Sequence, residues 1–268
     1  MSTINKDFEK KFHDEWADNE NLSLIDIKKS NEACTAPEMR LITNVLGDLK
    51  NKELLDVGCG LGEASVYFAS LGANVTSSDL SSGMLNATNT LAKINNLKIK
   101  KHLSSAEDMK LGSKLFDIVY TGNLLHHVDV DDTVKKISKH IKKDGMFVSW
   151  DPLHYNPIIN VYRMIATKVR TPDEHPLKKS DIKVIGKYFN NVETHFFWFF
   201  TLIIFILMAI VQRKNPNKER FWKVVVNEGE KWKWLYYPLE FLDKIILKIF
   251  PPLRWLCWNV VVVAKNPK

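Results

Sequence analysis

An apolar run that ends in an acid and passes into alternating glycines constrains this chain more than any other feature. Residues 54–64 read LLDVGCGLGEA, with Asp56 ahead of Gly58, Gly60 and Gly62. The apolar run predicts a buried parallel strand, and the glycines predict a tight turn into a helix. Glycine bends sharply and leaves no side chain between the backbone and a ligand. The stretch therefore predicts a ligand site at the carboxyl edge of an open α/β sheet.

A second acid follows at a fitting distance. Residues 75–79 read VTSSD and predict a second strand that ends in Asp79, with Leu80 directly after it. In doubly wound folds, a carboxylate about 20 residues beyond the glycine turn binds a ribose hydroxyl. Asp79 is therefore expected to contact a nucleoside.

Strand and helix patterns alternate along most of the chain. Strands are expected at 53–57, 73–78, 98–103, 115–120 and 145–150, and helices at 35–49, 62–71, 82–94, 131–142 and 158–168. A sixth strand is expected from Phe189 and a last one at 258–265. This alternation indicates a parallel sheet with helices on both faces.

Two further segments follow the strands expected at 98–103 and 115–120. Residues 104–109 read SSAEDM, and residues 122–128 read GNLLHHV. With the glycine turn and Asp79, they resemble class I S-adenosylmethionine-dependent methyltransferases of bacterial type, nearest to the group of the ubiquinone and menaquinone biosynthesis enzymes. The resemblance covers about residues 8–195 and the last strand. It implies a Rossmann-like, doubly wound, seven-stranded and mostly parallel sheet with an antiparallel last strand.

The resemblance also implies the cofactor, S-adenosyl-L-methionine, and the residues that bind it. These residues are Asp56, Gly58, Gly60, Gly62, Asp79, Leu80, Ser105, Ala106, Glu107 and Asn123. Ser105 departs from the pattern, because many relatives have an aspartate there. A serine accepts a hydrogen bond more weakly than a carboxylate does. Backbone groups at Ala106 or the Glu107 side chain are expected to take over part of the adenine recognition.

Histidines supply the candidates for a general base. A neutral imidazole suits the removal of a proton from a hydroxyl acceptor. His127 is the first candidate, His126 the second, and His154 and His175 follow at lower rank. Methyl transfer without a base is the alternative, since in-line positioning supplies much of the rate. No metal site is expected, because the adjacent pair His126 and His127 lacks metal-ligand spacing and no cysteine joins it.

Three regions are expected: a helical cap at 1–40, a methyltransferase core at 41–195 completed by 255–268, and a hydrophobic helical insertion at 196–254. The polar, aromatic stretch after the fifth strand, 151–180, is assigned to the acceptor site. Residues 196–211 are apolar except for Thr201. This run is shorter than the roughly 20 residues of a membrane-spanning helix. Residues 239–250 predict a second, amphipathic helix, with its polar residues along one stripe.

The net charge of +7 lies entirely in the last part of the chain. Residues 212–268 hold 12 Lys and Arg against 5 Asp and Glu, and six of the eight tryptophans fall between Trp198 and Trp258. Basic charge, aromatic residues and an amphipathic helix are typical of a monotopic membrane anchor. The charge follows aliphatic and aromatic residues rather than a polar groove, so no nucleic-acid partner is expected.

These observations predict methyl transfer to a lipid-linked or membrane-surface acceptor. Three widely spaced cysteines and a polar start without an apolar segment favour the cytoplasm, at the inner face of the membrane. Two alternatives stay open. One is a soluble small-molecule acceptor, with the insertion as a dimer interface or lid. The other is a cofactor-binding membrane adaptor without turnover. The oligomeric state is not predicted.

Overall fold

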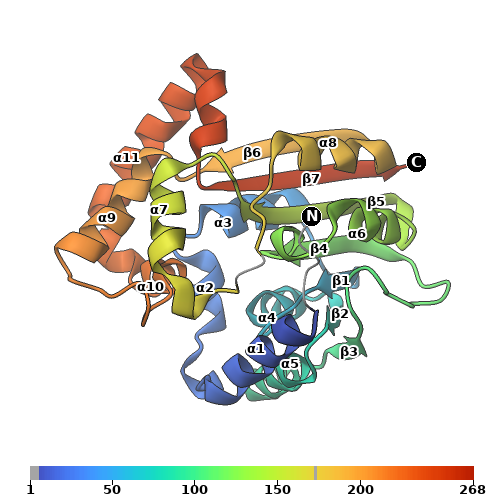
Figure 1. Cartoon of the computed structure of the whole chain (residues 1–268). Helices are drawn as coiled ribbons and strands as arrows, with labels where there is room; N and C mark the ends of the chain where they lie inside the picture. Colours follow the sequence, from blue (N-terminus) through green and yellow to red (C-terminus); the bar gives the residue numbers. More distant parts are fainter. Residues whose placement is uncertain (1–5, 172–173) are drawn as a thin grey trace.

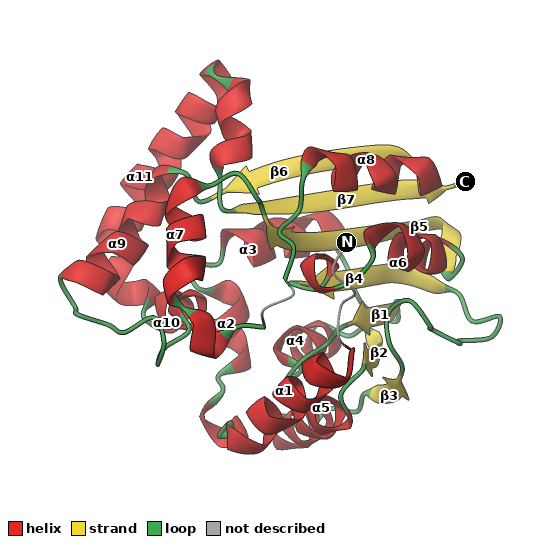
Figure 2. Cartoon of the chain, viewed as in Figure 1, coloured by secondary structure: helices red, strands yellow, loops and turns green. Residues whose placement is uncertain are grey.

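A seven-stranded sheet forms the centre of the protein. The computed structural model describes residues 6–171 and 174–268. The strands are β1 (Glu53–Val57), β2 (Asn74–Asp79), β3 (Lys100–Leu103), β4 (Phe116–Gly122), β5 (Ile141–Pro152), β6 (Phe189–Phe197) and β7 (Asn259–Pro267). Their order is β3-β2-β1-β4-β5-β7-β6, and β7 runs antiparallel to both neighbours (Figures 1 and 2). The predicted fold is confirmed.

Helices cover both faces of this sheet. They are α1 (Lys6–Asn19), α2 (Ile27–Glu32), α3 (Pro37–Leu46), α4 (Glu63–Ser70), α5 (Ser82–Ile94), α6 (Val130–Ser138), α7 (Pro157–Ile165), α8 (Lys179–Tyr188), α9 (Ile203–Ile210), α10 (Phe221–Asn227) and α11 (Gly229–Ile249). One apolar core joins α6 and α8 to the sheet, and a second joins α3, α4 and α5 to the other face. Successive residues of β1 alternate between them, since Leu54 packs in the second core and Leu55 in the first.

The expected elements lie where the pattern places them, with shifted ends. The strand at 53–57 and the helix at 82–94 coincide with β1 and α5. The helix expected at 131–142 ends at Ser138, because Ile141 already pairs with Phe116 in β4. β5 is correspondingly longer than expected and carries the chain to Pro152 at the carboxyl edge.

The apolar run 196–211 is not one continuous helix. β6 continues to Phe197, Trp198 turns the chain at a φ of 68°, and a 3-10 turn, η4 (Phe200–Leu202), leads into α9. Asp243 of α11 holds this turn, since its carboxylate accepts hydrogen bonds from the amides of Phe199 and Phe200 and from the Thr201 hydroxyl. Within the described residues, no helix has the length and apolar character needed to cross a membrane.

The second expected helix, 239–250, is the end of a longer one. α11 begins at Gly229 and continues through Pro238. Two of its acids face the protein, because Asp243 is buried and Glu240 pairs with Arg40 of α3. Apolar residues of the opposite face are exposed, among them Phe241, which is 65% exposed. The helix therefore presents an apolar side to its surroundings rather than to the protein.

The segment between β6 and β7 has a core of its own. Trp198, Phe205, Phe221 and Tyr236 are buried together there. Ring contacts join Trp198 to Phe205 and to Tyr236, with centroids 5.5 Å apart in both pairs. The segment is also attached to the first helices of the chain, since the Thr35 hydroxyl donates to the backbone oxygen of Val225 over 2.8 Å.

A buried carboxyl group joins α3 to β7. Asn259 Nδ2 donates to Glu38 Oε1 over 2.7 Å, and both residues are buried. Burial raises the pKa of Glu38 to about 7, against the hydrogen bond from Asn259, which lowers it. The unfolded chain releases this proton near pH 4.5 and the folded chain near 7, so stability from this site falls as pH rises through that window.

Replacing this acid should therefore stabilise the protein at high pH only. Glu38→Gln keeps an acceptor for Asn259 and removes the buried charge. We expect the free energy of unfolding to rise by about 2–3 kcal/mol above pH 8 and to change little near pH 4. Urea unfolding at the two pH values measures this, with the exposed Glu15→Gln as the control. An equal effect at both pH values would contradict the assignment.

Candidate active site

A cavity of about 450 Å³ opens at the carboxyl edge of β1, β4 and β5. The glycine turn, α1, the segment after β4, α7 and α10 contribute to its wall. Volumes of this order accommodate small organic ligands. Aromatic residues from six parts of the chain line it: Phe12, Trp16, Tyr120, Trp150, Tyr162, Trp222 and Trp258.

The three glycines of the turn serve different purposes. All have positive φ: 71° at Gly58, 54° at Gly60 and 89° at Gly62. A Cβ on Gly58 would lie 2.7 Å from Leu124, and one on Gly62 would lie 2.6 Å from Thr88. A Cβ on Gly60 would have no neighbour within 4 Å, and Gly60 lines the cavity. Gly58 and Gly62 allow close packing, whereas Gly60 leaves space beside the backbone.

The two strand-end acids flank this turn. Asp79 is buried, and its two oxygens accept hydrogen bonds from the amides of Gly60 and Ser81, each over 2.9 Å. Asp56 is buried as well and accepts from the Ser65 hydroxyl over 2.6 Å. Burial, with a smaller contribution from the charge of Asp79, raises the pKa of Asp56 to about 7, against the hydrogen bond from Ser65, which lowers it. Burial also raises the pKa of Asp79, against the two backbone hydrogen bonds.

Helix α1 covers the residues expected to bind adenosine. Lys6 Nζ lies 3.2 Å from Glu107 and 3.4 Å from the Ser105 hydroxyl. Asp14 accepts hydrogen bonds from the Ser81 hydroxyl and the Gly83 amide. The cap predicted at the start of the chain therefore packs directly on this part of the fold.

The cavity wall includes some expected cofactor residues and not others. Asp56, Gly58, Gly60 and Asn123 line it. Gly62, Asp79, Leu80, Ser105, Ala106 and Glu107 are not among its lining residues in the described part of the chain.

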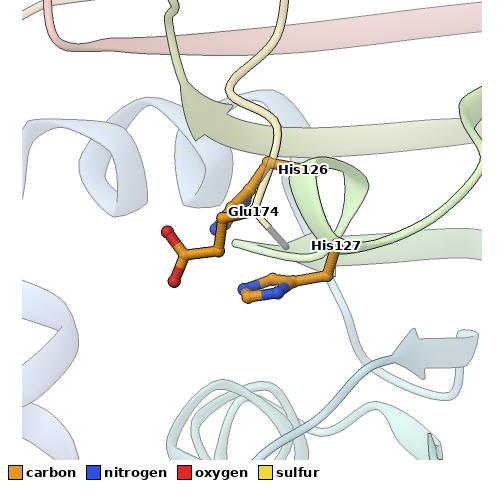
Figure 3. Close-up of side chains that lie close together, drawn as sticks. All are labelled: His126, His127 and Glu174. Carbon is orange, nitrogen blue, oxygen red and sulfur yellow. The ribbon is translucent and has the colours of Figure 1, made fainter. Parts of the chain in front are cut away.

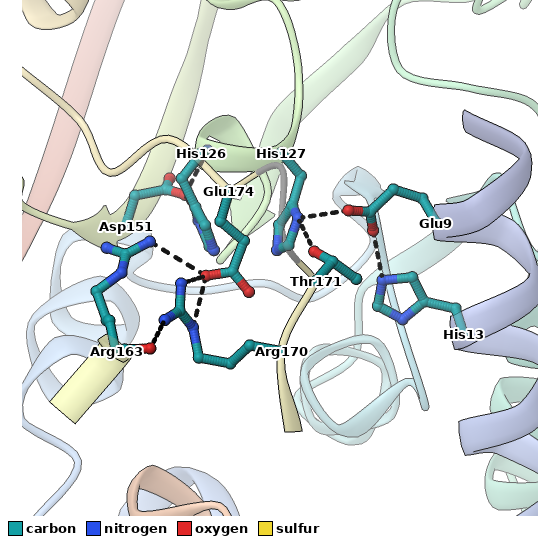
Figure 4. Close-up of polar contacts among 9 residues, drawn as sticks. All are labelled: Glu9, His13, His126, His127, Asp151, Arg163, Arg170, Thr171 and Glu174. Atoms are coloured by element: carbon teal, nitrogen blue, oxygen red, sulfur yellow. Dashed lines mark hydrogen bonds and ion pairs between the residues drawn. The ribbon is translucent and has the colours of Figure 1, made fainter. Parts of the chain in front are cut away.

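His126 forms a buried pair with Asp151. The short turn η2 (Leu125–His127) follows β4, and Asp151 lies near the end of β5. His126 Nδ1 and Asp151 Oδ1 are 2.8 Å apart, and the His126 amide donates to the same oxygen over 3.3 Å (Figure 4). Burial lowers the pKa of His126 well below its usual range, and the charges of His127, Arg163 and Arg170 lower it further. Burial raises the pKa of Asp151, against its backbone hydrogen bonds. The lowered pKa favours the neutral form of His126.

His127 contacts a different acid. Its Nδ1 lies 3.4 Å from Glu9 Oε1 and 3.4 Å from the Thr171 hydroxyl (Figure 4). Glu9 comes from α1 and also lies 3.3 Å from His13. Burial raises the pKa of Glu9, but hydrogen bonds from His127 and His13 outweigh it and leave the pKa well below its usual range. Glu9 thus attaches the cap to the turn after β4.

Glu174 and two arginines lie beside the histidines. Arg163 Nη2 and Arg170 Nε lie 3.1 Å and 2.8 Å from the same oxygen, Glu174 Oε2. Ligand atoms of His126, His127 and Glu174 lie within 4.8 Å of one another (Figure 3). This spacing suits a metal ion, but the two arginines already occupy the carboxylate and oppose a further cation. The expectation of no metal site stays a prediction.

The remaining histidine candidates lie elsewhere. His154 is exposed and contacts the Tyr155 ring, outside the cavity wall. The His175 amide donates to the His126 backbone oxygen over 2.7 Å, which fixes the loop after α7 against η2. Residues 151–180 contribute Ile159, Tyr162 and Arg163 to the cavity, whereas 172 and 173 lie outside the described residues.

Glu9 and Arg220 were not predicted, and Asp151 lies at the start of the predicted stretch 151–180 but had no role of its own assigned. Asp151 could have been found, because it ends a strand at the same edge as Asp56 and Asp79. Glu9 and Arg220 come from α1 and the start of α10, and no local pattern marks them. Arg220 lies over the Trp16 ring, 3.7 Å from its centroid.

Comparison with known proteins identifies the central part of the chain. Residues 55–149 match the family described as "Methyltransferase domain". A ubiquinone biosynthesis O-methyltransferase of Pelagibacter ubique is 40% identical over 103 residues, which are 38% of this chain and 42% of that protein. The enzyme of the same name from Rickettsia felis is 30% identical over 153 residues, 55% of this chain and 62% of that protein. The chain thus matches only about half the length of these relatives.

Solved structures share the fold at low sequence identity. A geranyl diphosphate C-methyltransferase from Streptomyces coelicolor has a TM-score of 0.57 at 13% identity, with 85% of this chain and 78% of that one covered. A phosphoethanolamine N-methyltransferase of Haemonchus contortus has a TM-score of 0.55 at 17% identity, covering 87% of this chain and 52% of that one. At these identities the likeness concerns the fold alone.

Proposed function

The chain carries a class I S-adenosylmethionine-dependent methyltransferase domain, and we propose that it methylates a hydroxyl of an apolar, quinone-related acceptor at a membrane surface. The observation that carries the chemical part is the position of His126 in the cavity, with the glycine turn in the same wall and the ring paired with buried Asp151. The names of the matched relatives, ubiquinone biosynthesis O-methyltransferases, support the acceptor class. The aromatic wall of the cavity suits a planar ring.

The residues of the turn fit the proposed cofactor. The open space beside Gly60 allows a ligand to approach the backbone, which a side chain would prevent. Each oxygen of Asp79 keeps a second lone pair for a ribose hydroxyl. Because α1 covers Ser105 and Glu107, we propose that this helix moves when adenosine binds next to them.

His126 supplies the proton acceptor of the proposed reaction. In the tautomer whose Nδ1–H donates to Asp151, Nε2 holds a free lone pair. Bound S-adenosylmethionine would supply an electrophilic methyl group. The acceptor oxygen forms a bond to that methyl carbon, the carbon–sulfur bond breaks, and the hydroxyl proton passes to His126 Nε2. Asp151 fixes the ring orientation and stabilises the imidazolium that forms.

An exposed apolar surface supports the membrane part of the proposal. Its residues come from α7 (Ile158, Val161, Met164, Ile165), α9 and its end (Ile203, Ile210, Val211) and α11 (Trp234, Tyr237, Phe241, Leu242, Ile245, Ile249). These helices lie together at one end of the molecule (Figure 1), and a shared core joins them. Exposed lysines of α11, including Lys233, Lys244 and Lys248, flank the apolar residues. Apolar patches bordered by lysine suit the interface of an anionic bilayer.

Cofactor binding should depend on the open side of Gly60 and on Asp79. Gly60→Val puts a branched side chain into that space at a positive φ and should abolish measurable binding of S-adenosylhomocysteine. Asp79→Ala should weaken binding by about 1.5–3 kcal/mol, the range for hydrogen bonds to charged groups. Calorimetry measures both, with the exposed Asp18→Ala as the control. Unchanged affinity in a folded Asp79→Ala protein would remove Asp79 from the site.

The base assignment predicts a particular pH profile. A neutral imidazole is required, so kcat/KM should rise with pH through the pKa of His126 and reach its plateau below pH 6.5, because burial lowers that pKa. His126→Ala should lower kcat by about 10²–10⁴ with little change in cofactor affinity. The exposed His154→Ala is the matched control. If His127→Ala shows the larger loss, the role passes to His127, and small losses in both variants indicate positioning alone.

Membrane attachment should depend on the exposed side of α11. Phe241→Ser combined with Ile245→Ser removes two exposed apolar side chains without touching the cavity. We expect co-sedimentation with phosphatidylglycerol vesicles to fall about tenfold or more, because two side chains that would be partly buried in the bilayer are lost. Ile94→Ser with Leu103→Ser, also exposed but distant, is the control. A wild-type protein that ignores such vesicles at low salt would favour the soluble-acceptor alternative.

A further inference from the structure

The arginines beside the histidines carry more positive charge than the protein neutralises. Arg163 and Arg170 share one carboxylate oxygen of Glu174, so the three side chains hold one excess positive charge. Arg163 and Arg170 are only 12% and 19% exposed. Burial and the charge of Arg170 lower the pKa of Arg163 to about 10, which still leaves it charged at neutral pH. An excess charge in a partly buried site is costly unless a ligand compensates it.

One donor of this cluster is unsatisfied. Arg163 Nη1 is buried and has no hydrogen-bond partner among the described residues. Arg170 Nη1, by contrast, donates to the Arg163 backbone oxygen over 3.1 Å. A buried donor without a partner costs about 1–3 kcal/mol, and both arginines line the cavity. The described residues thus leave one hydrogen-bond donor of this arginine pair unused.

The cluster lies next to the proposed base. Glu174 is within 4.8 Å of ligand atoms of His126 and His127, and Figure 4 shows both arginines reaching Glu174 beside the His126 ring. A group held by Arg163 would thus belong to the same molecule whose hydroxyl meets His126. Arginine binds carboxylates and phosphates in a forked geometry, which a neutral ring substituent cannot reproduce.

We propose that Arg163 and Arg170 form an oxyanion subsite, so that the acceptor carries a carboxylate or phosphate group close to the hydroxyl that is methylated. This inference rests on the proposed function, because it describes the acceptor of the same reaction. Glu174 holds the two arginines in place and competes with the acceptor for them. Helix α7 separates the subsite from the apolar surface, since Arg163 and Ile159 line the cavity and Ile158 and Met164 are exposed. The acceptor is therefore an anionic amphiphile.

Three probes of similar size test the subsite. We would measure the binding of 4-hydroxybenzoate, phenyl phosphate and phenol by calorimetry, with S-adenosylhomocysteine present. In the wild type, at least one anion should bind about tenfold tighter than phenol, the value of one charge-assisted hydrogen bond. The anion that gains shows whether carboxylate or phosphate is recognised. Equal binding of all three probes would overturn the proposal.

Two substitutions with opposite expected effects on anion binding make the test specific. Arg163→Gln should reduce the preference for the anion to about twofold or less, whereas Glu174→Gln should strengthen anion binding several-fold, because the arginines lose their competitor. A misfolded protein cannot give that gain. Lys218→Gln, an exposed cation outside the cavity, should change nothing. A preference that survives Arg163→Gln, or a loss in Glu174→Gln, would contradict the subsite.

The same titrations distinguish failure of the oxyanion subsite from failure of the proposed methyltransferase function. Binding of S-adenosylhomocysteine is recorded in every sample before a probe is added. If the cofactor product binds and the anion preference is absent, the subsite is wrong and the methyltransferase proposal stands. If the wild type does not bind S-adenosylhomocysteine, the proposed function itself fails.

Discussion

Three buried carboxyl groups at one edge of the sheet determine how the rest of the site is built. Asp56, Asp79 and Asp151 all lie at the carboxyl ends of strands, and each is buried. A buried acid is tolerated only where hydrogen bonds compensate it. The protein meets this requirement with the Ser65 hydroxyl, the amides of the glycine turn and the His126 ring. Of these groups, Gly60 and His126 also line the cavity.

The cap and the insertion close this edge from two sides. Trp16 of α1 receives Arg220 over its ring, and Lys223 of α10 lies 3.7 Å from Glu20 and 3.2 Å from Glu63. The cap thus contacts both the core and the segment between β6 and β7. That segment also carries the exposed apolar residues of α9 and α11.

The sequence reveals the sheet and its ligand edge because their signals are local. Asp56 and Asp79 each end an apolar or β-branched run, and that pattern alone places both acids at the carboxyl edge. The split of the run 196–211 could not be predicted, because it depends on Asp243, which is 42 residues from Thr201 in sequence. Hydrophobicity alone treats that run as one helix. The inward position of Asp243 likewise follows from tertiary contacts.

The candidate site could be predicted in part for the same reason. The histidine pair follows a strand that the pattern identifies, but its ranking depends on partners from other elements. The sequence ranks His127 first, whereas the structure pairs His126 with Asp151 and His127 with Glu9, two buried acids from different elements. Glu9 pairs with His127, and two arginines share Glu174. No local sequence pattern indicates either contact.

The reaction that we propose is methyl transfer from S-adenosylmethionine to a membrane-held, anionic acceptor. The most direct measurement incubates the purified protein with methyl-labelled S-adenosylmethionine and, in separate samples, a total lipid extract and a soluble metabolite extract. Label should pass into the lipid fraction, into a species that an anion-exchange resin retains. Label that appears only in the soluble fraction, or in neither, would contradict the account.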